Sequence, residues 1–273
     1  MNSTRETEIR EIAELLSAIT EQVTTKKVTG FLSMVGREYS GQLMVVGRAV
    51  NGWAGGRSPN ELRTDVQRLE YAYEVHKSVT ELMGKRCPMC WVTAQWSVSV
   101  EDYNRRWCTK CKEIYNTHKS PFWRVIRAVV SRLRIADVED NERSWSSHLV
   151  WSNLYKIAPH GGGNPSGKLR KAQLEGCKKL LEWELEQYRP NRILFLTDWW
   201  WADEFLGQAW EDRPKPNPQS PVRAVGRLKC GAHAAACVVA CHPQGKNEKN
   251  WVDEVVSAFG SVSTPLAKST RAS

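Results

Sequence analysis

Short apolar runs alternate along this chain with longer segments in which apolar residues recur every three or four positions. The runs predict strands at 43–46, 149–153, 192–196 and 234–240. The helical spacing of Ile9, Ile12, Leu16, Ile19 and Val23 indicates an amphipathic first helix, and further helices are predicted over 58–83, 120–133, 168–188, 199–206 and 248–259. Strands that alternate with helices favour a three-layer α/β/α fold with a central, mostly parallel four-stranded sheet.

The chain divides into one main domain and one small insert. Its 273 residues can bury one full α/β core and one appended module. We expect the main domain to comprise 1–84 and 120–260, with an insert at 85–119 between its two parts. Residues 261–273 are polar and are expected to form a disordered tail.

The insert carries two C-x2-C pairs. Cys87 and Cys90 form the first pair, and Cys108 and Cys111 follow after seventeen intervening residues. This spacing is typical of a zinc ribbon with four thiolate ligands, although four cysteines can also pack as small hydrophobic residues. A zinc ion with four protein ligands has no open coordination position, so we expect structural Zn²⁺ and no catalytic metal.

The charge of the chain indicates what kind of partner it binds, and its cysteines and amino terminus indicate its compartment. The 39 Lys and Arg residues outnumber the 30 Asp and Glu residues, which gives a net charge of +9. This charge favours a polyanion such as DNA through counterion release, and solubility explains it equally well. The polar amino terminus and the lack of a long apolar run predict a cytoplasmic protein without a membrane segment, whose cysteines are thiols or metal ligands.

Three loops are predicted to meet at the carboxyl edge of the sheet. They are the glycine-rich loop 47–56, the loop that follows Asn153, and the loop that begins at His242 and Pro243. An amide offers a donor and an acceptor side by side, and an imidazole can donate a hydrogen bond, so the two suit binding of a heterocyclic base. Taken singly, each residue is also typical of an ordinary turn.

The order of these segments resembles the uracil-DNA glycosylase superfamily over residues 40–56 and 120–258. Phe122 to Ile126 are similar to a segment of its mismatch-specific branch. A second set of residues resembles the pattern of its iron-sulfur branch: Ser152 and Asn153, followed by Pro159, Asn164, Pro165, Glu175, Cys177, Leu181, Pro190 and 192–196. The resemblance implies that Asn153 hydrogen-bonds a flipped base and that His242 stabilises charge on the departing base.

The first loop departs from that family's pattern. The family carries Asp, Asn or Glu after its glycine and then Pro, whereas this chain has Gly47, Arg48, Ala49 and Val50. Asn51 is the nearest substitute for positioning the attacking water, with Glu61 and Asp65 further along. We expect Gly47 and Arg48 to line the base site and Trp53 to stack on the base. Cys177 fits a ligand position of the iron-sulfur cluster, but Ile157 replaces another cysteine, so no cluster is expected.

The sequence therefore predicts a monofunctional DNA glycosylase that flips a base and hydrolyses its N-glycosidic bond. Glycines at 52, 55, 56 and 161–163 leave two loops without side chains, although glycine is also an ordinary turn residue. The room left by these glycines suits a bulky 5-substituted pyrimidine, as in modified phage DNA, and hence a role in antiviral defence. The alternatives are a uracil or mismatch repair glycosylase, and a non-catalytic DNA-binding sensor on the same fold.

Overall fold

The computed structural model describes residues 2–50, 52–81, 87–96, 116–139, 145–207, 210, 217–231 and 233–263. Asn51, Cys108 and Cys111, which the sequence singles out, lie outside these ranges. Most of the predicted insert and residues 264–273 of the predicted tail lie outside them as well. The last helix ends at Ser263, so the first three residues of the predicted tail are helical.

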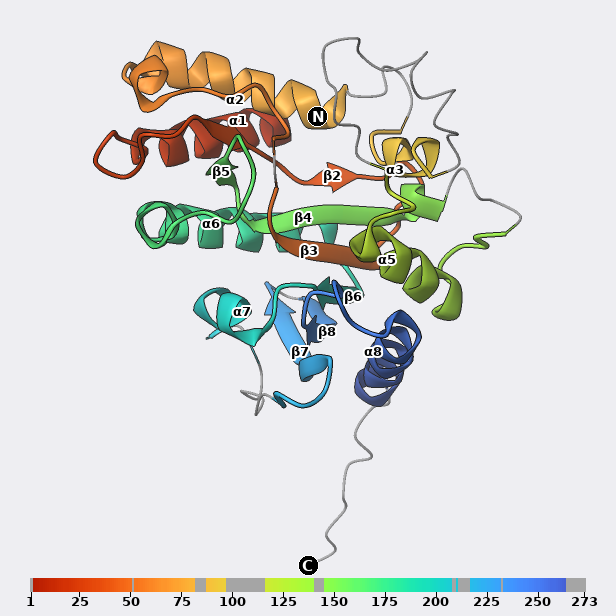
Figure 1. Ribbon diagram of the computed structural model, residues 1–273. Helices are drawn as coiled ribbons and strands as arrows, with labels where there is room; N and C mark the ends of the chain where they lie inside the picture. The colour runs from red at the N-terminus through yellow and green to blue at the C-terminus, as the bar shows by residue number, and fades with distance from the viewer. Residues whose placement is uncertain are drawn as a thin grey trace, which may run out of the picture.

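Six strands form the main sheet, in the order β2-β4-β3-β6-β8-β7 (Figure 1). The four central strands are β4 (Leu149–Tyr155), β3 (Leu43–Ala49), β6 (Arg192–Phe195) and β8 (His233–Ala240), and each is parallel to its neighbours. Short β2 (Met34–Val35) and longer β7 (Val222–Cys230) pair antiparallel at the two edges. The α/β class and the mostly parallel sheet are confirmed, whereas the number of four strands was wrong.

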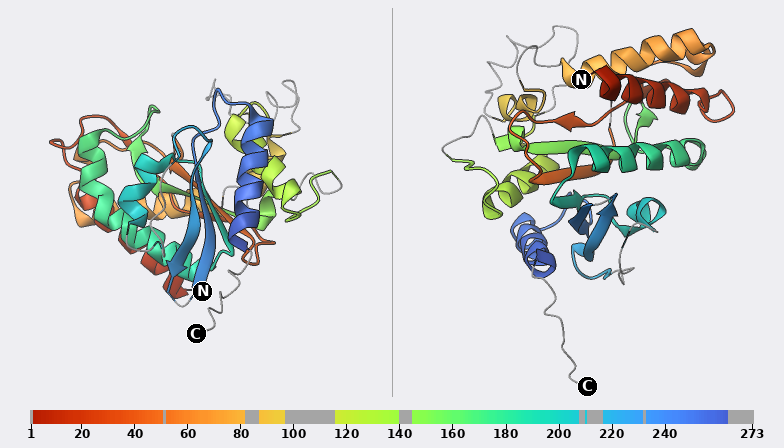
Figure 2. Two further views of the ribbon diagram at one scale, coloured as in Figure 1. Left: turned by 90° about the horizontal axis from the view of Figure 1, so that it is seen from below. Right: turned by 180° about the vertical axis from the view of Figure 1, so that it is seen from behind.

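Helices cover both faces of this sheet (Figure 2). Helices α5 (Pro121–Arg132) and α8 (Glu248–Ser263) lie on one face, and α1 (Asn2–Ser17) and α6 (Gly167–Tyr188) on the other, with α2 (Asp65–Thr80) packed on α1. The remaining elements are α7 (Trp199–Leu206), α3 (Cys90–Ala94), the 3₁₀ turns η1 (Pro59–Leu62) and η2 (Trp145–His148), and a ribbon of β1 (Val28–Gly30) with β5 (Ile157–Pro159). Among the described helices, none combines the length and the apolar character that a bilayer crossing requires.

The helix predicted over 58–83 is divided into two elements. Glu61 accepts hydrogen bonds from the backbone N–H and the hydroxyl of Ser58, as a capping box does, but this box opens only the short turn η1. A second box, in which Thr64 and Gln67 cap each other, starts α2 at Asp65. The sequence carries both capping signals, and the second one begins the long helix.

A buried ion pair joins α6 to the sheet. Lys156 Nζ lies 2.6 Å from Glu184 Oε1 and 2.7 Å from Ser152 Oγ, and the two charged side chains are 0% and 1% exposed. Ser152 in turn donates to Glu184 Oε2 at 2.7 Å, so both carboxylate oxygens have partners. Burial and the nearby Glu184 raise the pKa of Glu8, on α1, to about 7. Ser152 precedes Asn153, so this network anchors the strand that carries a predicted site residue.

Replacement of Lys156 by Met removes the cation and leaves the Glu184 carboxylate buried without it. We expect a loss of about 3 kcal/mol in the free energy of unfolding, measured by urea denaturation. The double variant Lys156→Met/Glu184→Leu removes both charges and should recover most of this loss. A single variant as stable as the unaltered protein would show that the pair does not hold α6 on β4.

Candidate functional site

The carboxyl edge of the parallel strands brings the predicted site residues together. In the register of β3 with β4, Gly47 pairs with Asn153, and Val46 pairs with Phe195 of β6. Strand β4 continues past Asn153 to Tyr155, which pairs with Ala49. The prediction that Asn153 ends its strand was therefore wrong, because β3 extends the ladder by the same length. Asn153 lies on the sheet surface just inside the edge.

The side chain of Asn153 lies across the backbone of Gly47. A Cβ atom at residue 47 would clash with Asn153 Oδ1, so the glycine is required for this side-chain position. Asn153 is 2% exposed, and its Nδ2 atom has no hydrogen-bond partner among the described residues. A buried amide donor without a partner costs about 1–3 kcal/mol, and such a group is typical of a site that a ligand completes.

Phe122 lies beside both Gly47 and His242. Its Cε2 atom lies 3.8 Å from the Cβ position of Gly47, and its ring stacks on the His242 ring with centroids 6.2 Å apart and an interplanar angle of 25°. Phe122 is the second residue of α5, which begins at Pro121. No pattern in the sequence points to a role for Phe122, although it lies in the segment 122–126 that carries part of the resemblance.

His242 is held as a hydrogen-bond donor facing this space. Its Nδ1 atom accepts the backbone N–H of Gln244 at 3.2 Å, which leaves the proton of the neutral ring on Nε2. Partial burial, together with the charge of Arg48, lowers the pKa of His242 below its ordinary value of 6.5. The imidazole is therefore neutral at pH 7, with Nε2–H available to a ligand.

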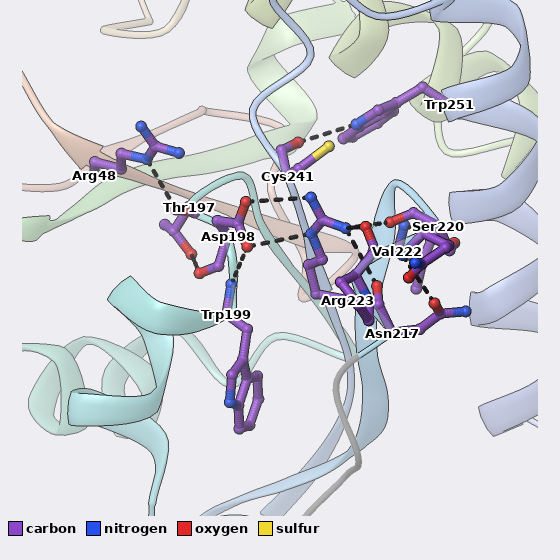
Figure 3. A network of polar contacts seen from close by, with 12 residues as sticks. Arg48, Thr197, Asp198, Trp199, Asn217, Ser220, Val222, Arg223, Cys241 and Trp251 are labelled. Atoms are coloured by element: carbon purple, nitrogen blue, oxygen red, sulfur yellow. Dashed lines mark hydrogen bonds and ion pairs between the residues drawn. The ribbon is translucent and has the colours of Figure 1, made fainter.

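Arg48 places a cation at the same edge (Figure 3). Its Nε atom donates to the carbonyl of Thr197 at 2.8 Å, and its guanidinium lies 5.6 Å from the ring centre of Trp201. Burial lowers the pKa of Arg48, and the nearby charge of Asp198 opposes this shift. Arg48 thus stands where the resembling family carries an acidic or amide side chain.

Asp198 fixes the loop against which Arg48 rests. Its backbone has φ +71° and ψ 159°, a conformation that is costly for any residue except glycine. Its carboxylate accepts the N–H of Trp199 at 2.8 Å, which caps α7, and pairs with Arg223 Nε at 3.2 Å (Figure 3). These contacts hold a strained loop at the end of β6, beside the other site residues.

Trp53 belongs to a cluster of aromatic rings under the first loop. Its ring contacts Trp91, Trp151 and Phe31 at centroid distances of 5.2, 5.4 and 5.5 Å. Trp91 follows Cys90 directly, so the loop, β4 and the first cysteine pair share one packed cluster. Phe122 is the ring beside Gly47 and His242, and the predicted stacking role of Trp53 stays a prediction.

The first cysteine pair forms a tight turn whose sulfur atoms suit metal ligation. Cys90 donates its backbone N–H to Cys87 O at 3.0 Å, and Arg37 donates its N–H to Cys87 Sγ at 3.1 Å. The thiol of Cys90 and these backbone donors lower the pKa of Cys87 to about 6, which favours the thiolate. The described residues contain no group of three or more potential metal ligands, and Cys108 and Cys111 lie outside them.

Cys177, which the resemblance places at an iron-sulfur ligand position, is packed in the core. The residue is fully buried, and burial raises the pKa of its thiol to about 12. Its sulfur lies 3.4 Å from the backbone nitrogen of Lys156 and 3.3 Å from Gln173 Oε1. The neighbouring Ile157 is buried in the core, where the iron-sulfur branch would need a cysteine.

This chain was compared with protein-family models and with curated proteins. No protein-family model matches it, and no curated protein does. Inferences about function therefore rest on the residues at the carboxyl edge: Gly47, Arg48, Phe122, Asn153 and His242.

The titration of His242 tests the electrostatics of this edge. In NMR spectra recorded against pH, His242 should titrate below 6.5, because burial and the Arg48 charge both disfavour its protonated form. The variant Arg48→Met should raise the pKa of His242, whereas Arg132→Met, on an exposed arginine of α5 that pairs with Asp253, should leave it unchanged. A pKa of His242 that does not respond to the loss of Arg48 would contradict this arrangement.

Proposed function

We propose that this protein is a monofunctional DNA glycosylase that extrudes a pyrimidine base from DNA and hydrolyses its N-glycosidic bond. The observation that carries the proposal is the juxtaposition of three groups at one sheet edge: Asn153 Nδ2, which has no partner in the described part of the chain, the ring of Phe122, and the Nε2–H of neutral His242. An amide, a flat ring and a neutral donor are the groups that bind an extruded base. The parallel centre of the sheet agrees with the fold that the resemblance to uracil-DNA glycosylases implies.

Recognition of the base falls to Asn153 and Phe122. The amide Nδ2 of Asn153 donates to a carbonyl oxygen of the pyrimidine, and Oδ1 accepts from a ring N–H or an exocyclic amine. The ring of Phe122 stacks on the flat face of the base. Gly47 has no side chain, which lets the Asn153 amide remain in this position.

Bond cleavage falls to His242 and Arg48. As the bond between C1′ and the base nitrogen breaks, its electron pair moves onto the base and positive charge develops on the sugar. A hydrogen bond from His242 Nε2 to a base oxygen strengthens as the base becomes an anion, so it lowers the barrier selectively. The half-buried Arg48 guanidinium adds a positive charge near this developing anion. Water then adds to C1′, its proton passes to the anionic base, and an abasic site and the neutral free base remain.

The group that positions this water is proposed to be Asn51, which lies outside the described residues. The two carboxylates that the sequence offered as substitutes have other contacts. Glu61 accepts both hydrogen bonds from Ser58, and Asp65 pairs with Arg68 at an exposed position on α2. Both carboxylates already have partners at exposed positions, which favours Asn51 as the proposed group.

The glycines of the two loops differ in the space around their Cβ positions. A Cβ atom on Gly56 would lie 2.6 Å from the His160 ring, so packing requires this glycine. Gly161, Gly162 and Gly163 have no atoms within 4 Å of their Cβ positions. The loop 161–163 is therefore open, and on this ground we propose a 5-substituted pyrimidine as substrate and an antiviral role. Uracil or mismatch repair is the second candidate within the same reaction.

We propose a structural zinc ion in the insert. We also propose that the protein is cytoplasmic, where thiols stay reduced and can bind the metal. The turn at Cys87 and Cys90 would supply two thiolates, and Cys108 and Cys111 would supply the others. Elemental analysis of the purified protein should find zinc in about a one-to-one ratio to the chain. Cys87→Ser should lower this ratio strongly, whereas Cys177→Ala should leave it unchanged. Metal-free protein, or iron that is lost in Cys177→Ala, would contradict the zinc site.

The reaction is tested with labelled DNA that carries uracil, a thymine mismatch, 5-hydroxymethylcytosine or its glucosylated form, followed by alkali to cut abasic sites. We expect cleavage with at least one substrate. His242→Ala should lower the single-turnover rate about 10²–10³-fold, because one donor to the developing anion is lost. Asn153→Ala should lower it by about 10-fold or more, since a buried hydrogen bond to the base is lost.

Two matched variants at the opposite edge of the sheet control for folding. His233 begins β8 and Asn191 precedes β6, so His233→Ala and Asn191→Ala should retain full activity. Circular dichroism should show the same fold in all four variants. Salt-sensitive binding of every substrate without an abasic product would favour the DNA-binding sensor and would overturn the glycosylase.

A further inference from the structure

A row of arginine and tryptophan side chains extends from the candidate site to the protein surface. The guanidinium carbons of Arg48 and Arg170 lie 5.6 and 4.8 Å from the ring centre of Trp201. Trp200 continues the row, with its ring 4.6 Å from that of Trp201 and 5.4 Å from the Arg170 guanidinium. Trp201 is buried, whereas Trp200 is 54% exposed. A large flat ring is thus presented to solvent next to the site.

The first turn of α6 adds positive charge beside this ring. It carries Lys168, Arg170 and Lys171 and no acidic residue, although the amino end of a helix favours acidic side chains. Lys168 and Lys171 are exposed, and Arg170 Nε is buried without a hydrogen-bond partner among the described residues. The three cations repel one another and the positive end of the helix dipole. A bound anion would relieve this repulsion.

The surface around this turn is open. Gly161, Gly162, Gly163 and Gly167 have no atoms within 4 Å of their Cβ positions, so the loop before α6 leaves the turn accessible. We name Trp200, Arg170, Lys168 and Lys171 the Trp200 platform. It combines a flat ring, which can stack on any base, with cations, which can bind phosphate.

We propose that the Trp200 platform binds the nucleotide next to the extruded one on the same DNA strand. The neighbouring base stacks on Trp200, and its phosphate lies against Arg170 and the two lysines. The contacts from Trp201 to Arg48 connect the platform with the base site, as two successive nucleotides of one strand require. This inference rests on the proposed function, and it names unpaired DNA as the form that the protein binds.

The test measures binding of an unmodified single-stranded oligonucleotide to the full chain by fluorescence anisotropy, over a range of salt concentrations. Trp200→Ala should weaken binding by about 10-fold or more, because one base loses its stacking partner. Trp200→Phe should stay within about threefold, since a flat ring remains. Tyr73→Ala, which removes a ring 46% exposed on α2, should have no effect.

The salt dependence separates stacking from charge. Arg170→Met should reduce the slope of log affinity against log salt by about 0.7, which corresponds to one phosphate contact on a single strand. Trp200→Ala should leave the slope unchanged. Unaltered affinity of Trp200→Ala for the single strand would overturn the platform, even if the protein forms abasic sites. Conversely, the expected binding results without any abasic product would support the platform and overturn the glycosylase reaction.

Discussion

The parallel pairing of β3 with β4 is the constraint on which the candidate site depends. This register sets Gly47 beside Asn153, and the missing Cβ atom of the glycine gives the amide its position. Pairing of β3 with β6, and of β6 with β8, then brings Thr197 and His242 to the same edge. A shift of one residue would turn Asn153 to the opposite face of the sheet, where Lys156 and Glu184 are buried. The proposed base contact at Asn153 and the buried network at Ser152 thus use adjacent residues of one strand that face opposite sides of the sheet.

The electrostatics of this edge follow from a cation where the resembling family has an acidic or amide group. Arg48 is kept half buried by the carbonyl of Thr197 and the ring of Trp201. Its charge and the burial of His242 keep the imidazole neutral, so the site has a permanent cation and a neutral donor. Such a site stabilises a developing anion without a change in its own protonation. This is consistent with the loss of a base as an anion, as the proposed reaction requires.

Much of the fold could be predicted from the sequence, because its central strands are apolar runs and its helices have clear periodicity. The strands near Val45, Trp151, Leu194 and Val238 were all identified. The edge strands were missed for physical reasons. Strand β2 has only two residues, and the apolar residues of β7 are interrupted by Arg223, Gly226, Arg227 and Lys229, so neither strand is a continuous apolar run. The helix expected from Ser58 is divided because the sequence contains two capping boxes. The box at Ser58 opens only a short turn, and the box at Thr64 begins the long helix.

The candidate site was less predictable, because its contacts join segments far apart in the chain. The pairing of Lys156 with Glu184, and the stacking of Phe122 on His242, have no local sequence signal. Asn153 and His242 were found because each lies at or near the carboxyl end of an apolar run. The sequence also could not predict that Trp53 packs with Phe31, Trp91 and Trp151, and its stacking on a base stays a prediction.

Mass spectrometry of the small molecules released from DNA tests the central claim most directly. The protein is incubated with DNA that contains uracil or 5-substituted pyrimidines, and the filtrate is analysed for free bases. We expect a free pyrimidine base, with the sugar-phosphate chain left intact, and release about 10²–10³-fold slower with His242→Ala. Release of nucleosides or nucleotides, or of nothing from any of these DNAs, would contradict it.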